Sequence, residues 1–384
     1  MGVRYRWGAA LLSLCLLTAA CGDQAPDHGE YALVAQPGDY DDGPNRMRGT
    51  LVESLRLGER VIFADRIDPE LTAGNGGGPL VGVRGVDDLL SGVQRTALDP
   101  FDVLAGFGVI GGNGLNDNEL KNKFLSITLL SLPDEAQATA AAQAMAAADF
   151  GATPENVPIV LTEYPAALAH WRPGVPTVGS WLVWKNQVIR LYAKIVDPNP
   201  EQLADLLTRT YRAQLAELET FTPTPAADLS NLKLDPDKLL PRIVKTDDYW
   251  PDRWDFLVTG PRAFALRNNE PRTRMRELEA NKVDTIAVAH NKFLYRTADS
   301  ASAESYAEVE KQQMLTRYRE TSGVAGLPGI SCYSALRPDP ASVPARRFAC
   351  LVRHGEFVVR INGNQEVETR RQAVAQYALL GGSW

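Results

Sequence analysis

The sequence has little cysteine and little histidine, which limits the chemistry that it can carry. Only 4 Cys and 4 His occur among the 384 residues. It contains no His-Glu-x-x-His motif and no pair of Cys or His residues at the spacing of metal ligands. The sequence therefore predicts no metal site, and we expect no cofactor.

A second long apolar run and an excess of positive charge are also missing. Beyond the N-terminus, no apolar segment reaches the roughly 20 residues of a spanning helix, so we expect no transmembrane helix in the mature protein. The formal net charge is −7, and an acidic surface repels nucleic acid and anionic lipid. The sequence therefore predicts that nucleic acid is not a partner. Its 45% hydrophobic and 23% charged residues are typical of a globular protein, and its length is typical of two domains.

The first 20 residues have the pattern of a secretory signal peptide. Arg4 and Arg6 form a short positive region, and an apolar run from Trp7 to Ala20 follows. The run is too short to span a bilayer, and it ends in small residues. Residues 1–20 are therefore predicted to direct export of the protein.

The residues around Cys21 resemble the lipobox of bacterial lipoproteins. Ala19 and Ala20 stand directly before Cys21, although Leu17 lies one position further from Cys21 than in the common form. The resemblance implies that the Cys21 thiol receives a diacylglycerol and that cleavage occurs just before it. The alternatives are simple secretion and a retained signal anchor. Residues 21–45 are polar and rich in Gly, Pro and Asp, so they are predicted to be a flexible tether to the outer face of the cell membrane.

The two remaining cysteines, Cys332 and Cys350, favour a structural disulfide. They lie in two segments with strand character that a Pro-rich connection joins, and an exported chain meets an oxidising environment. The alternatives are two buried free thiols and a redox or metal-binding pair.

Two stretches of the chain share one order of predicted elements, which indicates an α+β fold with two related domains. The order is strand, helix, strand, hairpin and helix, and each half is expected to form a small, mostly antiparallel sheet with packed helices. The predicted hairpins turn at Lys185-Asn186 and at His354-Gly355, and their alignment pairs Val183 with Val352. We expect an N-terminal domain over 46–222, a linker over 223–241 and a C-terminal domain over 242–384.

Several segments also resemble a family of uncharacterised lipoproteins from actinobacteria of the Nocardia and Rhodococcus group. They are the run "GDYDDGPNRMRGTLVESLRLGERVIFADRIDPELT", the pair of a strand and an Ala-rich helix, and the ending "QAVAQYALL". The resemblance implies a lipobox, an N-terminal and a C-terminal domain, and a cysteine pair in the second domain. It implies no known activity and no catalytic residues.

Local catalytic signatures are absent from the sequence. The "GFGVIG" run at 106–111 matches G-x-G-x-x-G but lacks the following helix of a dinucleotide site, so it is predicted to be a glycine-rich loop. The "GNGGG" run at 74–78 is predicted to be a flexible turn. No G-x-S-x-G motif occurs, and His28, His170 and His290, like His354, are expected to be solvated or buried without a catalytic role. The sequence thus favours a protein that is not an enzyme.

Aromatic residues provide the one candidate for ligand contact. Trp250, Arg253 and Trp254 occur close together, and exposed aromatic rings near charges form ledges for sugars or peptides. The alternative is packing in the core or between domains. We therefore expect a non-catalytic binding or scaffolding lipoprotein whose ligand is an unidentified small molecule, lipid or protein. The alternative is an envelope hydrolase that acts on lipid or glycan through residues distant in sequence.

Overall fold

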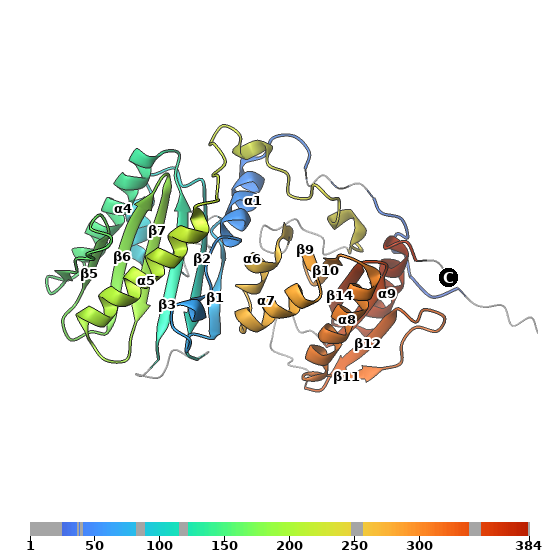
Figure 1. Cartoon of the computed structure of the whole chain (residues 1–384). Helices are drawn as coiled ribbons and strands as arrows, with labels where there is room; N and C mark the ends of the chain where they lie inside the picture. Colours follow the sequence, from blue (N-terminus) through green and yellow to red (C-terminus); the bar gives the residue numbers. More distant parts are fainter. Residues whose placement is uncertain are drawn as a thin grey trace, which may run out of the picture.

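The protein folds into two similar α+β domains, each built on one antiparallel sheet of seven strands (Figure 1). The structure is a computed structural model, and it describes residues 25–36, 38, 41–81, 89–114, 122–246, 256–337 and 347–382. Cys21 and the aromatic segment around Trp250 lie outside these residues.

The first sheet belongs to the N-terminal domain. Its strands are β1 (Ala73–Pro79), β2 (Ala105–Gly112), β3 (Phe124–Ser131), β4 (Val157–Pro158), β5 (Leu168–Trp171), β6 (Thr177–Trp184) and β7 (Gln187–Lys194). They are arranged in the order β1-β2-β3-β7-β6-β5-β4.

The second sheet repeats this arrangement strand for strand. Its strands are β8 (Phe256–Thr259), β9 (Val283–Ala289), β10 (Lys292–Thr297), β11 (Tyr318–Thr321), β12 (Ile330–Ala335), β13 (Phe348–His354) and β14 (Phe357–Gly363). Starting from β8, the order is β8-β9-β10-β14-β13-β12-β11, so each strand has a counterpart seven strands earlier. The prediction of two related α+β halves is confirmed.

Eight α-helices occur in the part of the chain that the structure describes. They are α1 (Arg46–Gly58), α3 (Gly92–Leu98), α4 (Glu135–Phe150), α5 (Pro200–Leu218), α6 (Pro261–Ala265), α7 (Pro271–Ala280), α8 (Ser300–Leu315) and α9 (Glu366–Leu379). Three short 3₁₀ helices are η1 (Ala64–Arg66), η2 (Leu229–Asn231) and η3 (Leu240–Arg242). None of the helices among these residues is long and apolar enough to cross a membrane.

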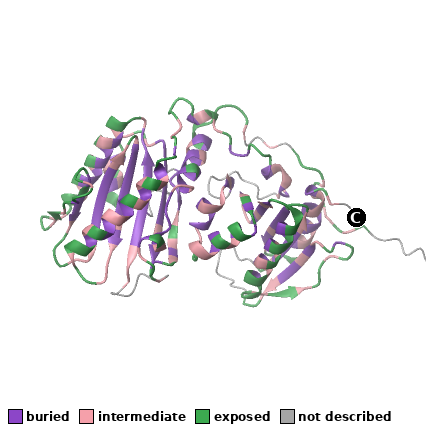
Figure 2. Ribbon diagram, viewed as in Figure 1, coloured by how far each residue is buried: buried purple, intermediate pink, exposed green. Residues whose placement is uncertain are grey.

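Helices cover both faces of the first sheet because both faces are apolar. Along β7, Ile189 and Leu191 pack with α5 in one buried cluster, while Val188 packs with α4 in another. Trp181 and Trp184 on β6 also point to opposite faces of the sheet. Trp181 is fully buried on the face that α4 covers, and Trp184 is partly buried on the face that α5 covers. The burial colouring of Figure 2 shows both sheets as the buried centres of their domains.

Both glycine-rich runs form strands, so the predictions of a loop and a turn are wrong. The 106–111 run lies in β2, where a Cβ on Gly108 would lie 2.3 Å from Cδ1 of Leu89 and one on Gly111 would lie 2.3 Å from Cβ of Ala64. The 74–78 run lies in β1, with an irregular register against β2 between Gly74 and Gly77. Glycine is present because neighbouring elements approach the backbone closely, which a sequence pattern does not reveal.

The second hairpin turns one residue later than predicted. The closing pairs are Trp184 with Gln187 and His354 with Phe357, so the turns are 185–186 and 355–356. The predicted alignment of the two halves is therefore one residue out of register. A second boundary also differs. The sequence predicts a helix over 300–320, but α8 ends at Leu315 and Tyr318–Thr321 form β11.

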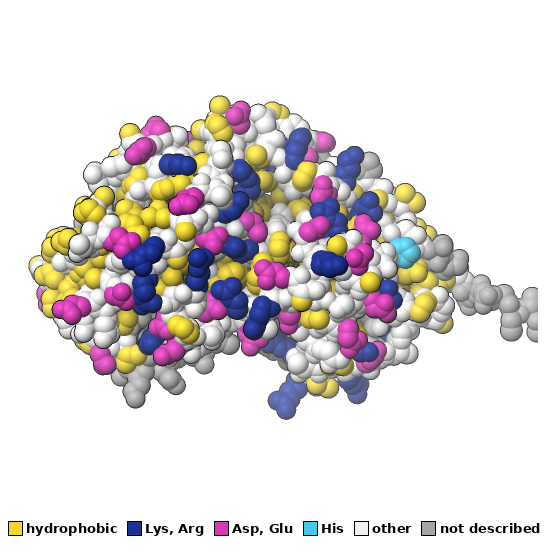
Figure 3. All heavy atoms as spheres, in the orientation of Figure 1, with side chains coloured by type: hydrophobic (Ala, Val, Ile, Leu, Met, Phe, Trp, Pro, Cys, Tyr) yellow, Lys and Arg dark blue, Asp and Glu magenta, His cyan; other side chains and the backbone are white. Residues whose placement is uncertain are grey.

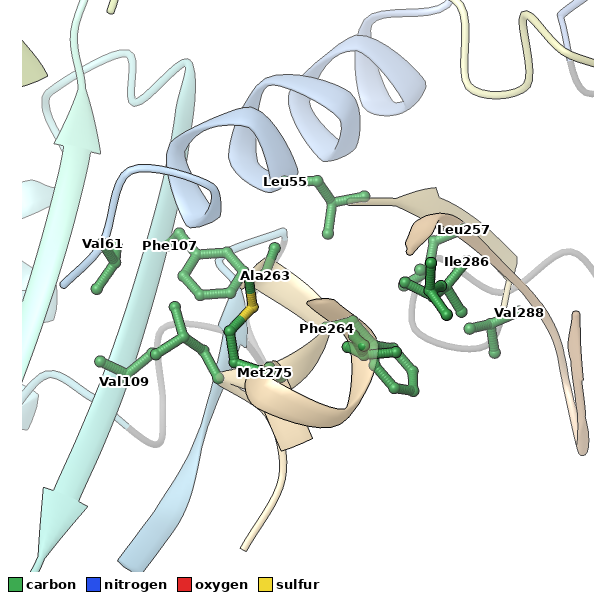
Figure 4. Close-up of a cluster of buried hydrophobic side chains, with 14 of the residues drawn as sticks. Leu55, Val61, Phe107, Val109, Leu257, Ala263, Phe264, Met275, Ile286 and Val288 are labelled. Atoms are coloured by element: carbon green, nitrogen blue, oxygen red, sulfur yellow. The ribbon is translucent and has the colours of Figure 1, made fainter. Parts of the chain in front are cut away.

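One hydrophobic core joins the two domains (Figure 4). Phe107 and Val109 on β2 face Ala263 and Met275 of α6 and α7, and all four are buried. The helices α6 and α7 lie between the two sheets (Figure 1). The domains are thus packed against each other through apolar side chains.

Ion pairs surround this apolar contact, and Figure 3 shows Lys and Arg gathered across the middle of the visible face. Arg272 forms an ion pair with Asp65 at 2.9 Å across the domain boundary. The carboxylate of Glu59 accepts hydrogen bonds from the backbone N–H groups of Arg262 and Ala263 at the start of α6. Burial raises the pKa of Glu59, and these two hydrogen bonds oppose the shift without cancelling it.

Part of the predicted tether lies against the C-terminal domain. Asp27 pairs with Arg371 of α9 at 2.9 Å. The Tyr31 hydroxyl donates a hydrogen bond to Glu368 and accepts one from Gln372 at 3.1 Å. The chain therefore contacts the C-terminal domain before it enters the N-terminal one.

The predicted disulfide between Cys332 and Cys350 is present. The two residues are direct partners on β12 and β13, and both are almost fully buried.

Candidate functional site

The N-terminal domain contains a cavity of about 660 Å³ over the strands β2, β3, β7 and β6. Its floor includes Ile110, Ser126, Arg190 and Gly179, one from each of these strands. The start of α3 and the C-terminal end of α4 line its sides, together with β5. The cavity thus lies on the face that α3 and α4 cover, away from the contact between the domains.

Arg190 is the most unusual residue of the cavity because it is a buried cation. It lies on the central strand β7 and is only 4% exposed. Its Nη1 donates to the carbonyl oxygen of Leu89 at 3.0 Å and, weakly, to Oγ of Ser126 at 3.5 Å. Its Nε has no hydrogen-bond partner. Burial lowers the pKa of Arg190 to about 10, which leaves it charged at neutral pH.

A second polar group in the cavity is the pair Asp149 and His170. Oδ2 of Asp149 lies 3.0 Å from Nε2 of His170, and Oδ1 accepts a hydrogen bond from Gln94 at 2.7 Å. The His170 ring stacks on Trp181 with centroids 5.5 Å apart. Packing and hydrogen bonds therefore hold this pair in place.

The environment of Asp149 keeps its carboxylate charged. Burial alone would raise the pKa of Asp149, but hydrogen bonds from His170 and Gln94 outweigh burial and lower the pKa. A lowered carboxyl pKa contributes stability above the pKa of the unfolded chain, and that contribution is lost as pH falls through the lower folded value. The pair is thus intact at neutral pH.

The C-terminal domain has two uncharged residues that pack in a hydrophobic cluster at the positions of this polar pair. The helices α4 and α8 have equal lengths, so Asp149 near the end of α4 corresponds to Met314 near the end of α8. The pairing of β5 with β6 and of β12 with β13 makes Tyr333 the counterpart of His170. Met314 and Tyr333 belong to one small hydrophobic cluster. The two copies of the fold therefore differ where the N-terminal domain carries its cavity.

The cavity has no arrangement that would activate a serine. Asp149 lies between Ser91, at 3.5 Å, and His170, and no hydrogen bond joins His170 to a serine in the described chain. A serine nucleophile needs a base next to it. No group of three or more His, Cys, Asp or Glu that could hold a metal occurs within the described ranges.

None of the described residues that line this cavity was among the sequence-predicted site residues. Cys21, Trp250, Arg253 and Trp254 lie outside the described residues. The cysteine pair is in the other domain.

Sequence reasoning missed Arg190 and gave His170 no role. The available signal was an arginine inside the apolar strand "QVIRLYAK", together with a second arginine in the matching hairpin strand "FVVRING". A charged side chain between apolar neighbours, on a strand that is buried on both faces, needs a counter-ion or a hydrogen-bond partner.

The fold defines a duplicated two-domain α+β protein whose N-terminal copy carries a cavity with a buried cation. Comparison with models of protein families assigns the chain to a family. Residues 40–234 match the domain of unknown function DUF7373, N-terminal, and residues 239–383 match its C-terminal domain. The chain belongs to this family.

Other comparisons add little. None of the curated proteins is significantly similar to the chain. Among solved structures, the crystal structure of the extracellular domain of PknH from Mycobacterium tuberculosis is similar at 11% identity and a TM-score of 0.26. The similarity covers 41% of this chain and 96% of that one.

Proposed function

We propose that this protein is an exported, lipid-anchored binding protein of the cell envelope, of the actinobacterial type, and that its ligand binds in the N-terminal cavity. The observation that carries the proposal is the cavity with its buried Arg190. A volume of about 660 Å³ is in the range of small-molecule sites. The buried disulfide supports export, because such bonds persist in oxidising compartments.

Blocking the mouth of the cavity is expected to remove the ligand. Ala152 is exposed and lines the cavity, so Ala152→Trp places a large ring there without disturbing the core. Native mass spectrometry of protein purified from membranes in mild detergent should show bound ligand in the wild type and none in Ala152→Trp. The matched control is Ala136→Trp, at an exposed position near the start of α4, the helix that ends two residues before Ala152, and this variant should keep the ligand. A bare wild-type protein, or retention by Ala152→Trp, would overturn the proposal.

Lipid anchoring has its own test at Cys21. Wild-type protein should carry a mass increment of several hundred daltons and remain with membranes, because acyl chains contribute about 0.8 kcal/mol per buried CH₂. Cys21→Ser should lose both properties. Cys15→Ser, in the predicted signal peptide, should change neither. Absence of the increment from the wild type would show that the protein is not lipid-anchored.

A further inference from the structure

The duplication allows Arg190 to be compared with its counterpart in the other domain. Gln187 and Phe357 stand at the same place after the two hairpin turns. Arg190 and Arg360 each follow three residues later, on β7 and β14. The fold thus places an arginine at the same position of both sheets.

The helices that face these arginines correspond in the same way. Both α4 and α8 have 16 residues, and Asp134 and Asp299 cap their N-termini with the same type of hydrogen bond. Counting from the caps, Met145 of α4 corresponds to Glu310 of α8. The two domains therefore carry a neutral and an acidic residue, respectively, at one equivalent position.

In the C-terminal domain, this acid neutralises the arginine. Glu310 is fully buried, and Nη1 of Arg360 lies 3.0 Å from its Oε2. Its Oε1 accepts hydrogen bonds from Arg274 at 2.5 Å and from the Tyr306 hydroxyl at 2.9 Å. The charge of Arg360 is thus balanced inside the domain.

In the N-terminal domain, Met145 supplies no charge. Arg190 makes no ion pair with any residue that the structure describes, whereas its Nε, like that of Arg360, has no hydrogen-bond partner. Asp149 is the one acidic residue among the described residues that line the cavity, and its oxygens are occupied by His170 and Gln94. Cζ of Arg190 lies 5.3 Å from the centroid of the Tyr192 ring, and Asp149 attracts Arg190 without forming an ion pair with it. A buried charge without a direct counter-ion is costly, so we regard the site as electrostatically incomplete.

The rest of the cavity indicates the kind of molecule that completes it. Lys194 also lines the cavity, so positive charge prevails there in a chain of net charge −7. Phe124, Trp171 and Tyr192 contribute aromatic surface, and Leu89 contributes aliphatic surface. A ligand that fits such a lining has an anionic group and an apolar body.

We propose that the ligand is an organic monocarboxylate whose carboxylate pairs with Arg190, as the Glu310 carboxylate pairs with Arg360, and whose apolar part contacts the aromatic lining. This inference rests on the proposed function, because it names the chemistry of the ligand in the same cavity. A carboxylate forms paired hydrogen bonds with a guanidinium. Arg190 is the one buried cation among the described residues that line the cavity, and one buried guanidinium balances one negative charge, which favours a monocarboxylate over a phosphate dianion.

The test is calorimetric titration of the full-length protein in detergent with octanoate and benzoate, compared with octanamide, benzamide and inorganic phosphate. We expect at least one carboxylate to bind and its neutral amide and phosphate to bind much more weakly. Arg190→Met should reduce carboxylate affinity by about 30-fold or more. The melting temperature of the ligand-free variant should change by only a few degrees, because removal of a buried charge offsets the lost hydrogen bond to Leu89, whereas a merely structural arginine would lower it strongly.

A second variant places the missing acid inside the protein. Met145→Glu should neutralise Arg190 and weaken carboxylate binding, whereas the uncharged control Met145→Gln should retain binding. If Met145→Glu does not fold, the carboxylate affinity of Arg190→Met tests the inference alone. Equal binding of amides and carboxylates, or unchanged affinity in Arg190→Met, would overturn the inference. If no probe binds while native mass spectrometry still shows a ligand that Ala152→Trp loses, the carboxylate inference fails and the proposed function stands.

Discussion

Replacing Glu310 by methionine is expected to destabilise the protein by about 3–5 kcal/mol, because it removes a buried carboxylate that two guanidinium groups share. Glu310 is fully buried and contacts the guanidinium groups of both Arg274 and Arg360. In Glu310→Met, the partly exposed Arg360 would lose its counter-ion, and the buried Arg274 would keep only Glu277, at 3.3 Å. Burial would raise the pKa of Glu310, but the two arginines outweigh burial and lower it, so the acid is charged at neutral pH.

Urea denaturation measured by circular dichroism would give the loss in the free energy of unfolding. Glu308→Met is the matched control, since Glu308 is exposed on the same helix, and it should change stability by less than about 0.5 kcal/mol. The double variant Glu310→Met/Arg360→Met should recover part of the loss, because Arg360 is then removed together with the acid that pairs with it. A loss below about 1 kcal/mol in Glu310→Met would show that the cluster does not hold the C-terminal domain together.

Removing the disulfide is expected to cost about 3 kcal/mol. Cys332 and Cys350 are separated by 18 positions, and a cross-link that closes a loop of this size restricts the unfolded chain by about that amount. The double variant Cys332→Ala/Cys350→Ala should therefore melt at a lower temperature than the oxidised wild type. Reductant should lower the melting temperature of the wild type and leave that of the double variant unchanged. Equal melting temperatures of oxidised wild type and double variant would contradict the prediction.

The two domains differ at the equivalent position of the fold: one carries a buried ion pair there, and the other carries a cavity. The C-terminal copy balances Arg360 with Glu310, and its equivalent of the Asp149 and His170 pair is uncharged. The N-terminal copy lacks the internal acid and holds a polar cavity there. We interpret the C-terminal copy as the structural one and the N-terminal copy as the binding one.

Much of the fold was predictable from the sequence, because the residue patterns that specify individual strands and helices are local in the chain. Runs of residues with strand character predicted β3, β6 and β7, and a run of strong helix formers predicted α4. The repeated order of elements predicted the duplication. The cysteine pair predicted the disulfide, since the two residues lie on strands that a short connection joins.

The tertiary structure decided what depends on distant neighbours. The glycines of β1 and β2 suit strands only because other elements approach them closely, and those contacts come from elsewhere in the chain. Whether Arg190 or Arg360 is paired depends on a residue of another helix, Met145 or Glu310, which no local pattern around the arginine contains. The sequence by itself determined the order of elements, the duplication and the covalent link. The fold decided which copy carries an unpaired buried charge, because electrostatic balance is a property of groups that only folding brings together.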